Sequence, residues 1–118
     1  MIADFKKLEI WKRSRLLVKS VYIILKLFSE TEKFGLVSQL KRAVISVPSN
    51  ISEGCGRRTN KDLSRFLDIA VGSLCEIETQ LYLAQDLSFI SNEQTDIILN
   101  ETIEIRKMII GFQNTLKI

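Results

Sequence analysis

Arginine and lysine are the side chains of this sequence whose type and spacing most suggest chemistry, and that chemistry is the binding of phosphate. The segment Gly54-Cys55-Gly56-Arg57-Arg58 superficially resembles a phosphate-binding loop. It follows a predicted helix rather than a strand, however, and it lacks the Gly-Lys-Ser/Thr ending of such loops. We therefore interpret this segment as the end of a helix, with two arginines placed where phosphate can approach them.

Basic residues gather in two parts of the chain, one within residues 39–65 and one within residues 6–19. Such clusters bind the backbone of RNA or DNA without reading its sequence. The candidate nucleic-acid-binding residues are Lys12, Arg13, Lys41, Arg42, Arg57, Arg58 and Lys61. The single Trp and two Tyr form no evident stacking platform, so sequence-specific binding of single strands is not predicted. A cluster of this kind is also typical of a solvated helix face.

The charge of the chain is unevenly distributed. Residues 1–58 hold 12 Lys and Arg against 5 Asp and Glu, a balance of +7, whereas residues 59–118 hold 5 against 9, a balance of −4. This polarity favours an anionic partner on one face. It is equally consistent with complementary charges between neighbouring helices or subunits.

Histidine, the commonest acid–base catalyst and metal ligand at neutral pH, is absent from the sequence. Cys55 and Cys75 are too few and too far apart for a zinc site. We therefore expect no enzyme, no metal and no cofactor. The sequence also lacks a signal-peptide pattern and an apolar run of the roughly 18–20 residues that cross a bilayer. Together with two unpaired cysteines, this predicts a cytoplasmic protein without a membrane partner.

The fold predicted from 118 residues, 46% of them hydrophobic, is all-α and a single domain spanning residues 1–118. Apolar residues recur at helical spacing over residues 4–28, 36–53, 60–87 and 92 to nearly the C-terminus, and the main stripe of the third segment runs from Leu63 to Ala84. Thr59 to Asp62 is a predicted cap at the start of the third helix, and Ser91 to Gln94 is a predicted capping box at the start of the fourth. Short connections then give an antiparallel up-down-up-down four-helix bundle. We expect Pro48 to kink the second helix and Gly54 and Gly56 to end it in left-handed conformations. Gly72, inside the third helix, indicates close packing.

The first and fourth predicted helices carry more apolar residues than one helix face can bury in a monomer. Surplus apolar surface is typical of a partner site, and it predicts self-association. The alternative is that rotation of these helices hides the extra residues. Asn50, Glu53, Arg65 and Glu76 also lie beside apolar stripes. We interpret them as structural, paired with Arg65 or Arg42 to fix the register of helices, although Glu53 or Glu76 in a functional site is the other interpretation.

The segment from residue 35 to residue 81 resembles the bacterial four-helix-bundle proteins first noticed as open reading frames within intervening sequences of 23S ribosomal RNA genes. The residues that carry this resemblance are Gly35-Leu36, Ser38-Gln39, Arg42-Ala43, Pro48 to Gly54, Gly56-Arg57-Arg58, Phe66 to Ala70, Gly72-Ser73-Leu74, Glu76 and Glu78 to Leu81. The similarity extends over nearly the whole chain, including Trp11. Ser29 departs from it, because the family often has proline there.

The resemblance implies a four-helix bundle that assembles into a ring, a pentamer, and it implies no catalytic residues. It also implies kinship with the accessory variability determinant of diversity-generating retroelements, which associates with a reverse transcriptase and nucleic acid. From residues and resemblance together, we predict a non-enzymatic homo-oligomeric protein that binds RNA or DNA through a basic surface. The alternative is a scaffold or accessory subunit for a protein partner such as a reverse transcriptase.

Overall fold

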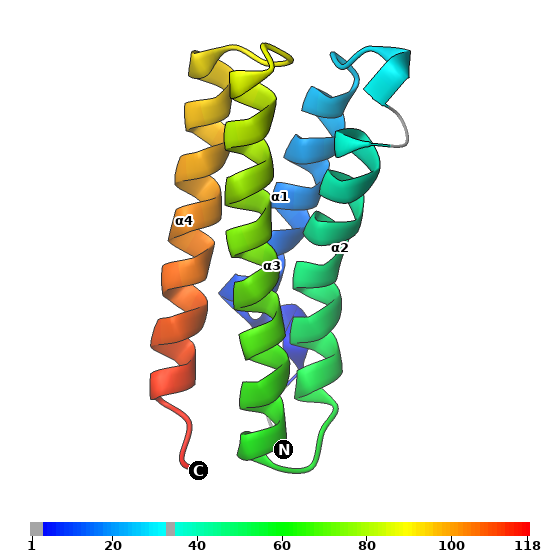
Figure 1. Ribbon diagram of the computed structural model, residues 1–118. Helices are drawn as coiled ribbons and strands as arrows, with labels where there is room; N and C mark the ends of the chain where they lie inside the picture. The colour runs from blue at the N-terminus through cyan, green and yellow to red at the C-terminus, as the bar shows by residue number, and fades with distance from the viewer. Residues whose placement is uncertain (1–3, 33–34) are drawn as a thin grey trace.

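The computed structural model describes residues 4–32 and 35–118, and over these residues the chain is all-helical (Figure 1). The α-helices of this region are α1 (Glu9–Leu25), α2 (Leu36–Cys55), α3 (Asn60–Asp86) and α4 (Asn92–Asn114), with two short 3-10 helices, η1 (Phe5–Lys7) and η2 (Glu30–Glu32). The α-helices lie side by side in a rod of 44 × 23 × 20 Å. In Figure 1 the colour runs upward along α1 and α3 and downward along α2 and α4.

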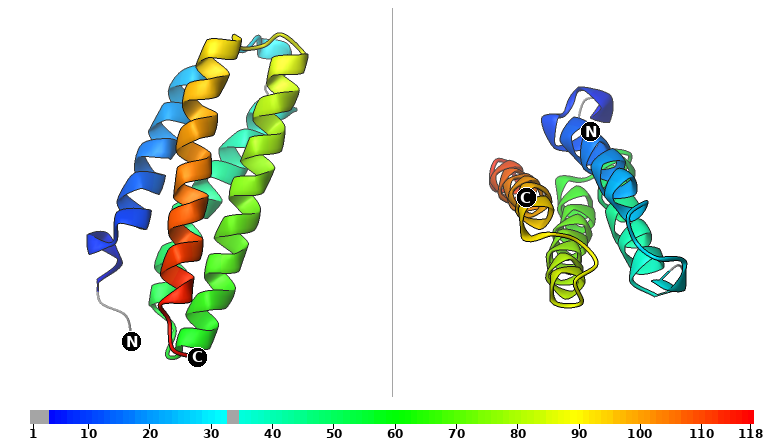
Figure 2. Two further views of the ribbon diagram at one scale, coloured as in Figure 1. Left: turned by 90° about the vertical axis from the view of Figure 1, so that its left-hand side faces the viewer. Right: turned by 90° about the horizontal axis from the view of Figure 1, so that it is seen from above.

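α1 and α3 occupy opposite corners of the bundle. No Cα atom of α1 lies within 8 Å of a Cα atom of α3, whereas α2 and α4 each pack against both of them. The view from above shows the same arrangement, with α2 and α4 on either side (Figure 2). The outward faces of α1 and α3 therefore point to different sides of the molecule.

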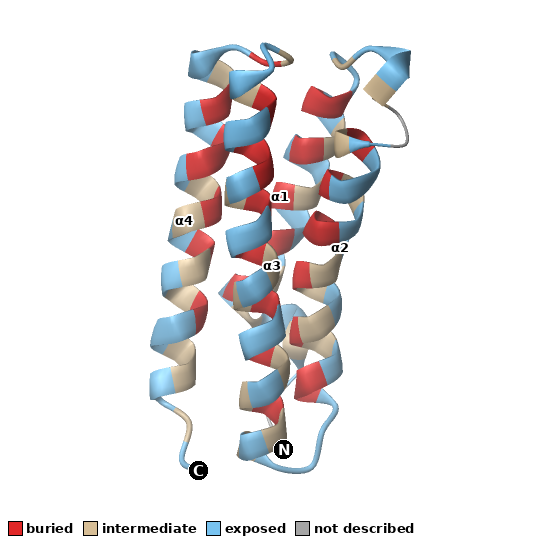
Figure 3. Cartoon of the chain, in the orientation of Figure 1, coloured by how far each residue is buried: buried red, intermediate tan, exposed pale blue. Residues whose placement is uncertain are grey.

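The buried core is formed by the apolar stripes that helical spacing predicts (Figure 3). Every residue of the predicted stripe of α2 and of the main predicted stripe of α3 is buried: Val37, Leu40, Val44, Val47, Ile51, Leu63, Leu67, Ala70, Leu74, Ile77, Leu81 and Ala84. The neighbouring predicted stripe of α3 is not, since Ile69 and Leu83 are exposed. Burial of such stripes supplies most of the free energy that holds helices together. In the described part of the chain, no helix combines the length and hydropathy that a membrane span requires.

The starts of α3 and α4 are fixed by the predicted caps. The Thr59 hydroxyl accepts a hydrogen bond from the Asp62 N–H, and Ser91 and Gln94 form a reciprocal capping box. After α3, Ser88 has a φ of 62°, and the Phe89 N–H donates to the Ala84 carbonyl. This left-handed residue ends α3 and turns the chain toward α4.

α1 is shorter than the predicted span 4–28. The Asp4 carboxylate accepts a bond from the Lys6 N–H and closes the 3-10 turn η1, and Leu8 is extended, so the α-helix begins only at Glu9. At its other end, α1 gives way after Leu25 to turns in which each N–H bonds the carbonyl three residues back. A local capping bond and tighter turns thus replace the first and last turns of the expected helix.

α2 runs unbroken through Pro48 and on to Cys55, beyond the predicted end at residue 53. The kink expected at Pro48 stays a prediction. The expectation that Gly54 and Gly56 end the helix in left-handed conformations is wrong, because no glycine in the described residues has a positive φ. Gly54 lies inside α2 and is buried, and Gly56 follows the helix with a φ of −83°.

The close packing expected at Gly72 is found at Gly54 instead. A Cβ atom added at Gly54 would lie 2.8 Å from Cβ of Phe66 and 2.9 Å from Cδ1 of Leu63, both on α3. A Cβ atom added at Gly72 would meet nothing within 4 Å. Gly54 therefore lets α2 and α3 approach closely, whereas Gly72 lies on an open surface.

Candidate nucleic-acid interface

The α2–α3 hairpin presents three of the predicted cations at one end of the rod. Arg57 and Arg58 lie in the turn between the helices, Lys61 lies in the first turn of α3, and all three side chains are exposed. The guanidinium of Arg57 stacks over the Phe66 ring, 4.6 Å from its centroid. Stacking holds the guanidinium while leaving its N–H groups at the surface, which suits bidentate binding of phosphate.

The contact at Gly54 creates this arrangement. Because α2 and α3 approach closely there, Phe66 lies within reach of the turn that follows α2. A further cation, Lys117, which is not among the predicted binding residues, also lies at this hairpin. The Asn60 side-chain amide donates to the Lys117 carbonyl at 3.0 Å, which brings the exposed Lys117 beside the start of α3. The clue available from sequence was topological, since four alternating helices return the end of the chain to the α2–α3 turn.

We call Arg57, Arg58, Lys61 and Lys117 the basic end. Arg65 also lies near it, but its guanidinium pairs with Asp62 at 3.4 Å, and both side chains are exposed. Between residues 53 and 65 the carboxylates are those of Asp62 and the exposed Glu53, against four Lys and Arg side chains. Cations therefore outnumber carboxylates in the segment that forms this turn.

Lys41 and Arg42 do not join the basic end. They lie about 15 residues before the α2–α3 turn, which is roughly 22 Å along a helix. The ammonium of Lys41 lies 5.1 Å from the centroid of the Tyr22 ring, and Arg42 donates to the Gln39 side chain at 2.8 Å. The structure thus separates the predicted hairpin cluster into two groups.

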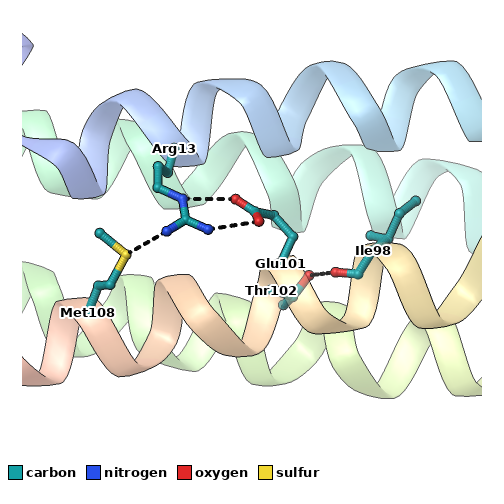
Figure 4. Close-up of polar contacts among 5 residues, drawn as sticks. All are labelled: Arg13, Ile98, Glu101, Thr102 and Met108. Carbon is teal, nitrogen blue, oxygen red and sulfur yellow. Dashed lines mark hydrogen bonds and ion pairs between the residues drawn. The ribbon is translucent and has the colours of Figure 1, made fainter.

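Arg13 bonds within the protein, across the seam between α1 and α4 (Figure 4). Its Nε and Nη2 atoms donate to the two carboxylate oxygens of Glu101 at 3.0 and 2.8 Å, and its Nη1 atom donates to the Met108 sulfur at 3.2 Å. The hydrogen bonds to Glu101 raise the pKa of Arg13, against the opposing effect of desolvation. The charge of Arg13 is therefore balanced by Glu101 within the protein. In this structure Arg13 joins α1 to α4 and does not present its guanidinium to phosphate.

Lys12, next to Arg13 in sequence, points to solvent and pairs with Glu9 at 3.6 Å. A pair this exposed contributes little to stability. Lys12 belongs to the outward face of α1, which the structure keeps apart from the basic end.

The pairing expected for Asn50, Glu53, Arg65 and Glu76 is wrong. Arg65 bonds Asp62, the amide of Asn50 donates to the Ser46 carbonyl and hydroxyl, and Glu76 accepts from Gln80. Each of these bonds joins residues three or four positions apart on one helix. Residues three or four positions apart lie next to each other on a helix surface, so these side chains find partners on their own helix.

Apolar side chains remain exposed on α1 and α4, as the surplus of apolar residues predicts. Leu16 and Ile23 of α1, Leu27 in the turn after α1 and Ile97 of α4 have between 56% and 67% of their surface exposed. They border a groove between α1 and α4 that contains a hollow of about 480 Å³. The groove is thus an apolar feature separate from the basic end.

Within residues 4–32 and 35–118, no three His, Cys, Asp or Glu side chains gather closely enough to hold a metal ion. Both cysteines are free; Cys55 is buried and Cys75 is exposed. Desolvation raises the pKa of the Cys55 thiol, so this cysteine is less ionised than an exposed one. The expectation of no metal and no catalysis stays a prediction.

The family model of the 23S rRNA-intervening sequence protein matches residues 6–111. The chain belongs to that family. A solved crystal structure of a protein of unknown function from the S23 ribosomal protein family of Bacteroides thetaiotaomicron superposes with a TM-score of 0.83 at 26% sequence identity, covering 90% of this chain and 99% of that one. No curated protein matches the sequence. Membership of the 23S rRNA-intervening sequence protein family confirms the resemblance, and the helices described above confirm the four-helix fold.

Proposed function

We propose that this protein is a non-enzymatic, homo-oligomeric protein of the cytoplasm that binds RNA or DNA through its basic end. The observation that carries the proposal is the grouping of Arg57, Arg58 and Lys61 at one exposed end, with Arg57 held against Phe66. Phosphate contacts of this kind need no base readout. The family's name links it to 23S rRNA, which favours RNA as the first ligand to test.

Self-association multiplies these contacts. A few cations on one subunit bind nucleic acid weakly at physiological salt. A ring, such as the pentamer that the family resemblance implies, presents the basic end once per subunit, and binding through several subunits raises the effective affinity by avidity. The exposed aliphatic residues along the α1–α4 groove support this association.

The test is fluorescence anisotropy with a labelled RNA of mixed sequence and a DNA of the same length, at 50 and 200 mM salt. We expect affinity to fall at least tenfold over this range, because each neutralised phosphate releases a counterion. Arg57→Glu/Arg58→Glu should abolish binding, and Arg58→Glu should weaken it. Lys107→Glu is the matched control for the single variant, since Lys107 is exposed on α4 and its reversal changes the net charge equally.

Binding that ignores salt and the Arg57→Glu/Arg58→Glu change would overturn the proposed mechanism. Absence of any binding by an assembled wild-type protein would favour the second candidate, a scaffold or accessory subunit for a protein such as a reverse transcriptase. The observation that favours this candidate is the apolar groove between α1 and α4.

A further inference from the structure

The outward face of α1, which we take to include Lys26 and Leu27 of the turn that follows the helix, is both basic and apolar. Leu16, Ile23 and Leu27 are 61%, 56% and 59% exposed, so more than half of each side chain meets water. From residue 12 to residue 27 the other exposed residues of this face are Lys12, Arg15, Lys19, Ser20 and Lys26, which include four cations. Lys12, Lys19 and Lys26 recur every seven residues, the spacing that keeps side chains on one seam of a helix pair.

A groove accompanies this face. Ser20 and Ile23 of α1 and Ile97 and Ile98 of α4 line two adjoining hollows, of about 480 and about 320 Å³. Lys19 lies at the border of the larger one. The α1 face therefore offers depressions for apolar side chains beside a row of cations.

The outward face of α3 has the opposite charge. Its exposed residues from 68 to 87 are Asp68, Ile69, Gly72, Cys75, Glu76, Thr79, Tyr82, Leu83, Asp86 and Leu87. They include three carboxylates and no lysine or arginine, and Ile69, Tyr82, Leu83 and Leu87 are between 46% and 58% exposed. Figure 3 shows the side of α3 that faces the viewer as largely exposed.

The middle of the α3 face also carries only short side chains. A Cβ atom added at Gly72 would meet nothing within 4 Å, so packing within the subunit does not require glycine there, although glycine costs about 1 kcal/mol inside a helix. Cys75 and Thr79 continue this line of small side chains by one and two turns. Small residues at the centre of an exposed apolar face allow a second helix to approach closely.

We propose that the α1 face of one copy docks on the α3 face of the next copy. The two faces have opposite charge, each carries exposed aliphatic residues, and their lengths match at roughly 22 and 28 Å for helical spans of this size. Because α1 and α3 occupy opposite corners of the bundle, the contact is head-to-tail, and repetition closes a ring or extends a filament. The inference rests on the self-association in the proposed function, and it leaves the basic end of every copy free.

The test exchanges the charges of the two faces. Lys19→Glu/Lys26→Glu makes the α1 face acidic, and Glu76→Lys/Asp86→Lys makes the α3 face basic; each variant alone should shift the native mass from oligomer to monomer. A variant that carries all four reversals in one chain should reassemble to the wild-type mass, because every altered α1 face then meets an altered and complementary α3 face, whatever the number of subunits in the ring. Native mass spectrometry reads this directly, and far-UV circular dichroism checks that each variant is helical.

A second variant tests the face without altering charge. Gly72→Leu places a large side chain at the centre of the α3 face and favours the helix, so we expect a folded protein that fails to assemble. Gly111→Leu is the matched control, since a Cβ atom added at Gly111 on α4 also meets nothing within 4 Å. Assembly of the wild type should also slow alkylation of Cys75.

The outcomes separate the two proposals. A wild-type oligomer whose mass is unchanged by either charge reversal overturns the α1–α3 contact and leaves self-association standing. Reversals that dissociate the oligomer singly and fail to restore it when combined in one chain overturn the pairing of these two faces. A monomeric wild type overturns both the contact and the proposed oligomer. Arg57→Glu/Arg58→Glu should keep the oligomeric mass and lose only nucleic-acid binding, which makes failure of that function separately visible.

Discussion

The seam between α2 and α3 and the seam between α1 and α4 show two different ways of joining helices. At the first, Gly54 removes a side chain so that α3 can approach, and the Ser46 and Ser73 hydroxyls bond across the interface at 2.9 Å. At the second, Arg13 and Glu101 bridge the helices, and an open groove bordered by exposed aliphatic residues lies beside them. One seam is completed within the chain, whereas the other leaves apolar surface for a partner.

This difference distinguishes surface that is buried when the subunit folds from surface that is left exposed for association. A seam filled by apolar side chains to crystal-like density is sensitive to the change of a single methyl group. A seam held by a partly exposed ion pair tolerates substitution, because solvent screens the pair and can replace it. The following variants test this contrast, and stabilities should be compared at one protein concentration, since association shifts the apparent free energy of unfolding.

The largest expected effect is that of removing a buried leucine. Leu74→Ala on α3 should lower the free energy of unfolding by about 2–5 kcal/mol, because Leu74 is fully buried and its loss leaves a cavity. Leu16→Ala, beside the groove, should change subunit stability by about 0.5 kcal/mol or less. Urea denaturation measures both, and equal losses would contradict the contrast between packed and open seams.

Adding a methyl group tests the close approach of α2 and α3. Gly54→Ala should cost about 1–3 kcal/mol of unfolding free energy, because the new Cβ atom would lie 2.8 Å from Phe66. Gly72→Ala should instead stabilise the subunit by up to about 1 kcal/mol, the helix propensity gained at an open position. The midpoints of thermal unfolding should therefore move in opposite directions, and a stabilising Gly54→Ala would show that the helices can separate at little cost.

The ion pair between α1 and α4 should contribute less than either of these. Glu101→Gln removes the charge of the carboxylate that binds Arg13, and we expect a loss of about 1 kcal/mol or less, since about a third of each side chain is exposed. The loss should shrink as salt is added. Asp96→Asn, also on α4 and exposed, is the control, and a salt-independent loss for Glu101→Gln would point to packing rather than charge.

Substitution of a cysteine should have the smallest effect on the free energy of unfolding, but the two thiols should differ clearly in their reactivity. Cys75 is exposed on the outer face of α3, whereas Cys55 is buried near the end of α2 and its pKa is raised by desolvation. The thiolate is the reactive form, so at neutral pH a dithiobis-nitrobenzoate assay of dilute protein should titrate Cys75 quickly and Cys55 only after denaturant is added. Cys75→Ser should remove the fast phase, and a fast phase that survives would place Cys55 at the surface.

Much of the fold could be predicted from sequence because helical periodicity and caps are local signals. The buried stripe from Leu63 to Ala84 and the capping box at Ser91 were predicted correctly and are confirmed. The role of Gly54 was not predicted, since a glycine at the end of an apolar stripe has the same pattern whether it caps a helix or admits a neighbour. Only the distance between two helices decides between these roles.

The candidate site was less predictable than the fold. Arg57, Arg58 and Lys61 were predicted from the sequence, and they do lie together at the α2–α3 turn. Lys41 and Arg42 were predicted as part of the same cluster, but they lie near the other end of α2. The bond between Arg13 and Glu101 joins residues 88 positions apart, and no periodicity encodes such a pair. Charge content is visible in a sequence, whereas the partner of each charge depends on tertiary contacts.

Trp11, the single tryptophan of the chain, gives the molecule its own optical probe. Its indole ring packs edge-on against Phe5, with centroids 5.2 Å apart, and the guanidinium of Arg15 lies 4.9 Å from its centroid. Arg15 belongs to the outward face of α1, so a partner that draws this cation away, or excludes water from above the indole, alters the emission. The intrinsic fluorescence of Trp11 therefore reports the binding of a partner at that face without an attached dye.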